Sequence, residues 1–363
     1  MARSRDRTAN HPDATRQTAL IRPLSHVGFP APSSATGPQA GPLVSIVIPT
    51  LNEERSISTC LDSVLAQTWR NLEVLVVDGG STDATRELVA EYGAVDARVR
   101  LVDNPRRTQP AAMNTAAAVV KSPWLVRVDA HSTVPADYVE LVMEHLSTGE
   151  FGGVGGRKDG VATSVQGRAI AAALGSKFGV GNSTYHHGTK AQAVDHIPFG
   201  AYPVDVINDL GGWDESISSN EDFEFDYRVR QSGRTLLFDP RLVIFWETRQ
   251  NVRDFFGQYR RYGRGKALVL AKHPASASAR HLLPAAVVAA LTFAIMLLPV
   301  KPRWALAIIA PYAGLLAMAS ASLAPALPVA ESRRWLPAAF AAMHLGYGIG
   351  FWETLLAGRR PNS

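Results

Sequence analysis

Short apolar runs alternate with amphipathic stretches from residue 43 to residue 131, and this alternation is the strongest constraint on the fold. The runs at 43–48, 72–77, 98–102 and 125–128 are predicted to be strands, since each is short and rich in Val, Ile and Leu. Segments 53–67 and 109–120 are predicted to be helices between them. This order predicts an α/β domain with a parallel sheet and helices on both faces.

Polar loops follow the first two predicted strands. Pro49, Thr50, Leu51 and Glu53 belong to the loop after the first strand, and Asp78 opens the loop after the second. In open α/β sheets ligands bind beyond the carboxyl ends of the strands. Backbone groups near Thr50 and Leu51 could therefore hold a base and ribose, and Asp78 could accept the N3–H of a uracil. Ordinary β–α turns are the alternative interpretation of both loops. No G-x-G-x-x-G sequence opens either following helix, so a dinucleotide site is not indicated.

The strand at 125–128 delivers Asp129 and His131 at its end. Two side chains in an Asp-x-His pattern can reach one divalent cation where the strand begins to turn. A carboxylate with an imidazole suits Mn²⁺, and Mg²⁺ less well, because nitrogen ligands favour transition metals. An Asp at a strand end is also a common helix cap or turn former, and this remains the alternative.

Three motifs together carry a family resemblance. Residues 44–54 read VSIVIPTLNEE, residues 76–83 read VVDGGSTD and residues 128–131 read VDAH. The combination resembles the family 2 glycosyltransferases of the GT-A fold, a Rossmann-like fold for nucleotide-diphospho-sugars. The resemblance implies that Asp78 and Asp129 contact the nucleoside, and that an Asp-x-Asp motif binds Mg²⁺ or Mn²⁺ with the diphosphate. His131 stands where the second carboxylate is usual. The predicted nucleotide-binding set is Pro49, Thr50, Leu51, Glu53, Asp78 and Asp129, with Asp129 and His131 as metal ligands.

A second chemical centre is predicted where Glu221 and Asp222 open the helix 222–231. A carboxylate at a helix N-terminus stays ionised because the helix dipole favours negative charge, and an ionised carboxylate can act as a general base on a sugar hydroxyl. A pair of ordinary helix-starting acids is the alternative. The resemblance implies that Asp222 is the base and that Glu221 orients the site. Residues 175–245 look closest to the branch that builds succinoglycan-type bacterial exopolysaccharides.

Residues 258–262, QYRRY, are similar to the family's Q-x-x-R-W motif, with Tyr262 in place of Trp. The resemblance implies catalytic roles for Gln258 and Arg261, and an arginine fork suits diphosphate oxygens. The neighbouring Arg260, Arg264 and Lys266 could instead hold anionic lipid. Upstream, residues 175–200 are predicted to form a long irregular loop that acts as a lid or contacts the acceptor.

The charge balance and the cysteine count limit the remaining classes. The formal charge of +5 suits anionic partners, but no basic patch interleaved with aromatic residues indicates nucleic acid. The single cysteine, Cys60, excludes an intrachain disulfide. Residues 1–41 lack any periodic apolar pattern and are predicted to be a disordered tail.

Three apolar segments follow the predicted catalytic domain, which we place at 42–272. The segments 282–300, 305–330 and 335–357 each suffice in length to cross about 30 Å of hydrocarbon. They predict a membrane domain, 282–357, of about three transmembrane helices. Basic residues lie on alternating sides of these segments and do not settle their orientation. A multi-pass cell-membrane protein with a cytoplasmic catalytic domain is expected, because nucleotide sugars are made in the cytoplasm.

These inferences predict a membrane-anchored inverting glycosyltransferase. It would move a hexose from a nucleotide sugar, expected to be a UDP-sugar, to a polyprenyl-linked or polysaccharide acceptor in cell-surface polysaccharide biosynthesis. Three spans favour addition of single sugars over processive synthesis. Two alternatives stay open: a sugar-phosphate nucleotidyltransferase, for which 49–54 lacks the expected glycine- and lysine-rich phosphate loop, and a non-catalytic membrane scaffold with a degenerate transferase domain.

Overall fold

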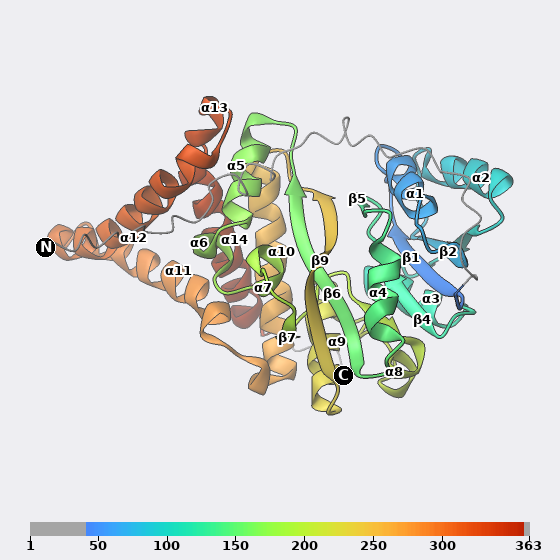
Figure 1. The fold of residues 1–363 in the computed structure, drawn as a ribbon. Coiled ribbons are helices and arrows are strands. Elements are labelled where there is room, and N and C mark those ends of the chain that lie inside the picture. Colours follow the sequence, from blue (N-terminus) through green and yellow to red (C-terminus); the bar gives the residue numbers. More distant parts are fainter. Residues whose placement is uncertain (1–40, 359–363) are drawn as a thin grey trace, which may run out of the picture.

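The computed structural model describes residues 41–358, so the predicted tail at 1–41 lies almost entirely outside the described residues. A mixed sheet forms the centre of this part of the chain, in the order β3-β2-β1-β4-β8-β6-β9-β5, with β7 paired to β9 (Figure 1). The strands are β1 (Val44–Thr50), β2 (Leu72–Asp78), β3 (Val99–Asp103), β4 (Trp124–Arg127), β5 (Ser132–Thr133), β6 (Phe151–Val161), β7 (Gln192–Val194), β8 (Ala201–Pro203) and β9 (Thr235–Glu247).

Helices cover both faces of the sheet and then form a separate C-terminal group. Those up to the end of the sheet are α1 (Ile57–Leu65), α2 (Thr85–Val95), α3 (Gln109–Ala117), α4 (Tyr138–Leu146), α5 (Val165–Leu174), α6 (Lys177–Val180), α7 (Thr184–His187), α8 (Val204–Asp209) and α9 (Glu221–Gln231). The C-terminal ones are α10 (Val252–Lys272), α11 (Ala279–Leu297), α12 (Pro302–Leu323), α13 (Ala330–Arg333) and α14 (Leu336–Leu356).

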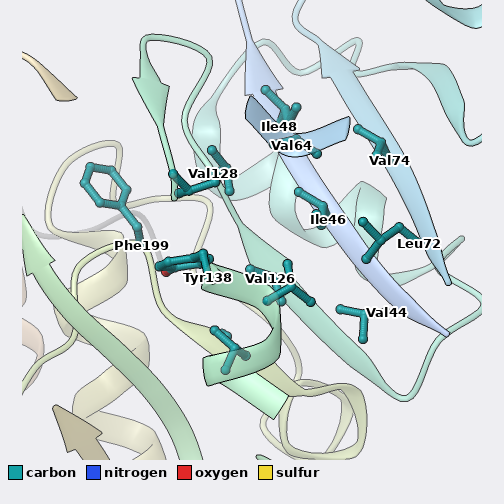
Figure 2. Packing of buried hydrophobic residues seen from close by; sticks show 14 of the residues in the cluster. Val44, Ile46, Ile48, Val64, Leu72, Val74, Val126, Val128, Tyr138 and Phe199 are labelled. Carbon is teal, nitrogen blue, oxygen red and sulfur yellow. The ribbon is translucent and has the colours of Figure 1, made fainter. Parts of the chain in front are cut away.

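Alternation of side chains along β1 explains the two cores. Ile46 and Ile48 point to the face covered by α1 and α4, whereas Val47 points to the face covered by α3 and α8. Figure 2 shows the first of these cores, with Ile46, Val74 and Val126 side by side on neighbouring strands. Because β1 and β2 are buried on both faces, most of their positions are apolar.

The parallel sheet predicted from the first four strands continues as a mixed sheet beyond β4. Strands β3, β2, β1 and β4 run parallel, as the strand–helix alternation predicted. Strand β8 then runs antiparallel to both β4 and β6, and β5 and β7 run antiparallel to β9. The alternation on which the prediction rested ends near residue 131, so it contained no information on the direction of the later strands.

The glycine-dense start of β6 is explained by close packing of side chains. A Cβ atom on Gly153 would lie 2.7 Å from the ring of Tyr202, and one on Gly155 would lie 2.6 Å from Ile197. Both neighbours are fully buried in the core beside α9. These glycines therefore admit large neighbouring side chains, and this packing, rather than a ligand, accounts for them.

Helices α11 and α12 extend as a hairpin away from the sheet (Figure 1). Within residues 41–358 they are the two helices that are long and apolar enough to cross a membrane, and most of their surface is exposed. The expectation of about three spans stays a prediction, and α11 and α12 are the helices that meet these criteria of length and composition. The predicted third segment, α14, packs along α10, where Gly346 and Gly350 bring the two backbones into contact. His344 and Glu353 reduce its hydropathy.

Candidate active site

The end of β4 and the start of α9 lie next to each other and are joined by one buried arginine. Arg127 Nε donates a hydrogen bond to Asp129 Oδ1 at 2.8 Å, and Arg127 Nη1 lies 3.6 Å from Glu221 Oε1. Gln109, at the start of α3, donates to the same oxygen of Asp129 at 3.4 Å. The two carboxylate motifs predicted from the sequence therefore form one electrostatically connected site.

Asp78 lies at the end of β2, as predicted, but its carboxylate is already occupied. It accepts hydrogen bonds from the backbone of Gly80 and Ser81, from the Ser81 hydroxyl, and from Arg86 Nη1 at 2.6 Å. Burial alone would raise the pKa of Asp78, but these donors outweigh burial and lower it. A uracil N3–H would have to share an acceptor that the chain itself already uses, so the role of Asp78 in base recognition stays a prediction.

The loop after β1 reaches the Asp129 site through Glu53. Glu53 Oε1 lies 3.1 Å from His131 Nδ1. Burial of the His131 ring opposes its protonation, but the hydrogen bond to Glu53 and the negative charges of Asp129 and Glu53 outweigh this and raise the pKa of His131. The contact leaves the other ring nitrogen, Nε2, for a ligand. Thr50 is buried and Leu51 is exposed, and both lie beside the Asp78 loop, where Gly79 N–H donates to Thr50 O.

Glu221 and Asp222 have opposite protonation tendencies. Burial, together with the adjacent charge of Asp222, raises the pKa of Glu221 to about 7. Burial also opposes ionisation of Asp222, but the charges of His196 and Arg127 outweigh it, so the pKa of Asp222 is lowered. Two neighbouring carboxyl groups whose pKa values are pushed apart are a typical acid and base arrangement. These opposite shifts favour Asp222 as the ionised member of the pair.

His196 is fixed beside Asp222 by a buried carboxylate. Its Nδ1 lies 2.7 Å from Asp226 Oδ2, while its Nε2 lies 3.9 Å from Asp222 Oδ2. The same Asp226 carboxylate accepts hydrogen bonds from the Tyr202 hydroxyl and the Ile197 N–H, and these bonds hold the carboxylate in place. Helix α9 thus carries both the candidate base, Asp222, and, about one turn later, Asp226, which orients the imidazole of His196 beside that base.

The Gln258–Tyr262 motif on α10 is held against the start of α9. Asn220, which has a left-handed backbone conformation (φ 65°), donates from its side chain to Tyr262 O. A Cβ atom on Gly265 would lie 2.1 Å from Ser219 O, so glycine is what permits this approach. Gln258 and Arg261 line the same cavity as Asp222, and Gln258 Oε1 is buried without a hydrogen-bond partner within residues 41–358.

Two of the basic residues that we had associated with lipid are ion-paired instead. Arg260 and Arg264 both bind Glu353 of α14. Lys266 forms no ion pair in the part of the chain that the structure describes, and it lines the cavity. The predicted loop 175–200 contains the short helices α6 and α7, and its residues Phe178 and Tyr185 also line the cavity.

A cavity of about 950 Å³ joins these elements. Its polar end is lined by Asp129, His131 and Asp222. Its other end is lined by residues of the apolar helices, among them Val287 of α11 and Leu315 of α12. The cavity therefore runs from the carboxyl ends of the strands to the helices that could enter a membrane.

The residues present fit a metal ion that is held largely by its substrate. Asp129 and His131 supply one carboxylate and one free ring nitrogen, and residues 41–358 contain no cluster of three or more His, Cys, Asp or Glu side chains suited to a metal. Mg²⁺ sites often use only one or two protein ligands and complete the shell with water and substrate phosphates. Arg127 already binds the Asp129 carboxylate, so the metal would share that ligand.

Sequence reasoning missed Arg127, Lys158 and His196 as site residues. Arg127 carried a signal, because a charged residue within an otherwise apolar strand is costly unless it is paired. Lys158 lies in the glycine-dense strand β6, with its ammonium 3.9 Å from the Trp246 ring centroid and 4.6 Å from that of Phe199. Burial lowers the pKa of Lys158 to about 8. His196 gave no signal, because its partner Asp226 lies 30 residues away.

Comparison with known proteins identifies the family. The sequence model described as Glycosyl transferase family 2 matches residues 45–185, and that of Glycosyl transferase family group 2 matches residues 124–322. Succinoglycan biosynthesis protein ExoA of Rhizobium meliloti (strain 1021) is 36% identical over 322 residues, which cover 87% of this chain and 96% of that protein.

Two further proteins are more distant. One is a dolichyl N-acetyl-alpha-D-glucosaminyl phosphate 3-beta-D-2,3-diacetamido-2,3-dideoxy-beta-D-glucuronosyltransferase of Methanococcus voltae. Its sequence is 26% identical over an alignment that covers 63% of this chain and 74% of that protein. The mannosyltransferase PcManGT from Pyrobaculum calidifontis, solved with GDP-Man and Mn²⁺, has a TM-score of 0.56 at 20% identity and 88% coverage of both chains. The predicted GT-A fold is confirmed, and the match over 124–322 with the 36% identity shows that the chain belongs to the family 2 glycosyltransferases.

Proposed function

We propose that this enzyme transfers a hexose from a nucleotide sugar to a lipid-linked acceptor, with inversion at the sugar's anomeric carbon, in exopolysaccharide biosynthesis. The observation that carries the proposal is the cavity between Asp129 and the apolar helices α11 and α12. A water-soluble donor and a membrane-bound acceptor need such a common space. The similarity to a succinoglycan biosynthesis protein supports the exopolysaccharide role.

The donor is placed over the carboxyl ends of β1, β2 and β4, with UDP as the expected nucleotide. Backbone groups at Pro49, Thr50 and Leu51 border the nucleoside, and Asp129 lies below the diphosphate. A bound Mg²⁺ or Mn²⁺, held by Asp129 and His131, would neutralise diphosphate charge. Glu53 fixes the His131 ring so that Nε2 faces the ligand. Mn²⁺ in the complex of the similarly folded mannosyltransferase PcManGT is consistent with this proposal.

Asp222 is proposed as the general base. It accepts the proton of an acceptor hydroxyl while the hydroxyl oxygen forms a bond to C1 of the donor sugar. The bond from C1 to the diphosphate oxygen breaks in the same step, so the configuration at C1 inverts. Arg261 lines the cavity and would pair with the departing diphosphate. Glu221, held by Arg127, positions the start of α9 and keeps Asp222 in place.

The acceptor is proposed to be a polyprenyl-linked saccharide that approaches from the membrane. Helices α11 and α12 would lie in the cell membrane, with the sheet domain on the cytoplasmic side where nucleotide sugars are made. A growing polysaccharide acceptor is the alternative. The apolar lining at the far end of the cavity favours the lipid-linked form.

The test uses the full-length protein in lipid nanodiscs with a panel of radiolabelled nucleotide sugars. We expect label from one donor to enter the lipid extract and, by NMR, the product to carry the opposite anomeric configuration to the donor. Binding of UDP without transfer from any donor, with all candidate acceptor lipids supplied, would favour the scaffold alternative. Release of pyrophosphate from UTP and a sugar phosphate would favour the nucleotidyltransferase alternative, which family membership already disfavours.

A further inference from the structure

Lys266, on α10, is a buried lysine whose ammonium forms no ion pair with any described residue. Its side chain is 4% exposed, and its ammonium lies 3.1 Å from the centroid of the Phe223 ring. None of the ion pairs within residues 41–358 includes it, whereas Lys272, two turns further along α10, pairs with Asp214 and Glu224. A buried ammonium is costly unless an anion compensates it. Lys266 lines the cavity, so a ligand in the cavity can supply that anion.

The surroundings of Lys266 separate it from the donor site. Phe223 follows Asp222 on α9, so the lysine lies one aromatic side chain beyond the candidate base. Arg280, at the start of α11, also lines this part of the cavity and is bound to Asp195. Asp222, Arg280 and Asp195 are the charged groups that act on Lys266. Because burial outweighs the attraction of Asp222, the pKa of Lys266 is lowered to about 7, and an entering phosphate would restore the charge.

Along α11 the residues that line the cavity become apolar after Arg280 and His281. Residues of three helices form its wall there: Leu283 and Val287 of α11, Leu315 of α12, and Met343 of α14. Helices α11 and α12 are the two that could cross a membrane. Cations at the junction between a polar cavity and an apolar groove match a ligand with a phosphate head and a hydrocarbon tail.

We infer that Lys266 and Arg280 form a second anion site, which binds the phosphate of a prenyl-phosphate lipid whose chain lies between α11, α12 and α14. This inference rests on the proposed function, because the lipid is the carrier of the acceptor sugar. The order along the cavity is then donor diphosphate at Asp129, acceptor sugar at Asp222, lipid phosphate at Lys266 and prenyl chain at Val287.

The probe for this site is farnesyl diphosphate, and its binding is measured by calorimetry on the full-length protein in phosphatidylcholine nanodiscs. Saturating UDP with Mn²⁺ keeps the donor site filled, so that a diphosphate cannot bind there. Lys266→Met keeps the length of the side chain and its packing on Phe223. We expect this variant to bind farnesyl diphosphate about tenfold to a hundredfold more weakly, the loss typical of one charged hydrogen bond. Lys190→Met, at an exposed lysine outside the cavity, should bind as the unaltered protein does.

The groove is tested separately. Val287→Trp should weaken binding of farnesyl diphosphate but leave binding of inorganic pyrophosphate unchanged. Ile295→Trp, on the exposed surface of the same helix, is the matched control. Equal affinity for pyrophosphate and farnesyl diphosphate would indicate a free-phosphate site and overturn the lipid assignment. Loss of farnesyl diphosphate binding in phosphatidylglycerol nanodiscs would assign the site to bulk phospholipid and also overturn it.

Circular dichroism and UDP affinity of each variant establish that it is folded. If Lys266→Met binds farnesyl diphosphate normally while the unaltered protein transfers sugar to lipid, the site assignment fails and the proposed function stands. If the unaltered protein transfers no sugar to any lipid, the proposed function fails whatever the result with farnesyl diphosphate.

Discussion

Replacing Asp222 with Asn tests the assignment of the general base. The change removes the negative charge but preserves the shape and the local hydrogen bond that Asp222 Oδ1 accepts from Phe223 N–H. General-base catalysis contributes about 10²–10⁴ in rate, which corresponds to roughly 3–5 kcal/mol of transition-state stabilisation. The Asp222 side chain is only 23% exposed, so water has limited room to replace it as a base. We therefore expect a loss in kcat near the upper part of this range.

Glu221→Gln is the matched comparison, because it makes the same chemical change one residue away. The raised pKa of Glu221, about 7, means that its carboxyl group is largely protonated below that pH, and Gln imitates the protonated form. The loss in Glu221→Gln should therefore be small below about pH 7 and should grow as the pH rises. The loss in Asp222→Asn should be large throughout the neutral pH range, since the lowered pKa keeps Asp222 ionised there.

The assay follows transfer of labelled sugar to the lipid extract under saturating donor, with UDP affinity measured by calorimetry on the same preparations. UDP affinity in Asp222→Asn should stay within a fewfold of the unaltered protein, because the base does not contact the nucleotide. Near-normal kcat in Asp222→Asn, or a larger loss in Glu221→Gln at low pH, would refute the assignment of Asp222 as the base.

Three further predictions concern the metal, the helix packing and the buried lysine. A chelator should abolish transfer and His131→Ala should raise the Mn²⁺ concentration needed for half-maximal activity; full activity in chelator would contradict the metal site. Gly350→Val should destabilise the fold by about 1–3 kcal/mol, because its Cβ would lie 1.9 Å from a carbonyl oxygen of α10. Gly314→Val is the control, because a Cβ there would meet open space. Thermal unfolding in detergent compares the stabilities of the two variants. Binding of farnesyl diphosphate should weaken as the pH rises through about 7, where Lys266 loses its proton, and Lys266→Met should abolish that dependence.

Local sequence was sufficient to predict the first half of the sheet. Strands β1 and β2 are buried on both faces, so their apolar runs could be read without knowledge of their neighbours. The polar residues at strand ends were equally readable, because parallel strands place their carboxyl ends at one edge. Asp78 and Asp129 could be named as site residues for this reason, whereas Asp222 was named from its place in the first turn of a predicted helix and from the family resemblance.

The contacts between distant segments were decided by the tertiary structure alone. Whether Asp78 is free or occupied depends on Arg86, which reaches back from α2 to the strand end. The neighbours of α14 could not be read from the sequence either, because an apolar helix in a protein core and one in a bilayer have similar compositions. The structure packs Gly346 and Gly350 of α14 against the backbone of α10.

The sequence by itself determined which residues can carry chemistry, since residue type and position at a strand or helix end are local properties. It could not determine which of them meet. Arg127 joins Asp129 to Glu221, and Asp226 holds His196 beside Asp222. These side chains meet only when β4, the loop before β8 and α9 pack against one another. Protonation of these groups depends on burial and on neighbouring charge, and both exist only in the folded chain.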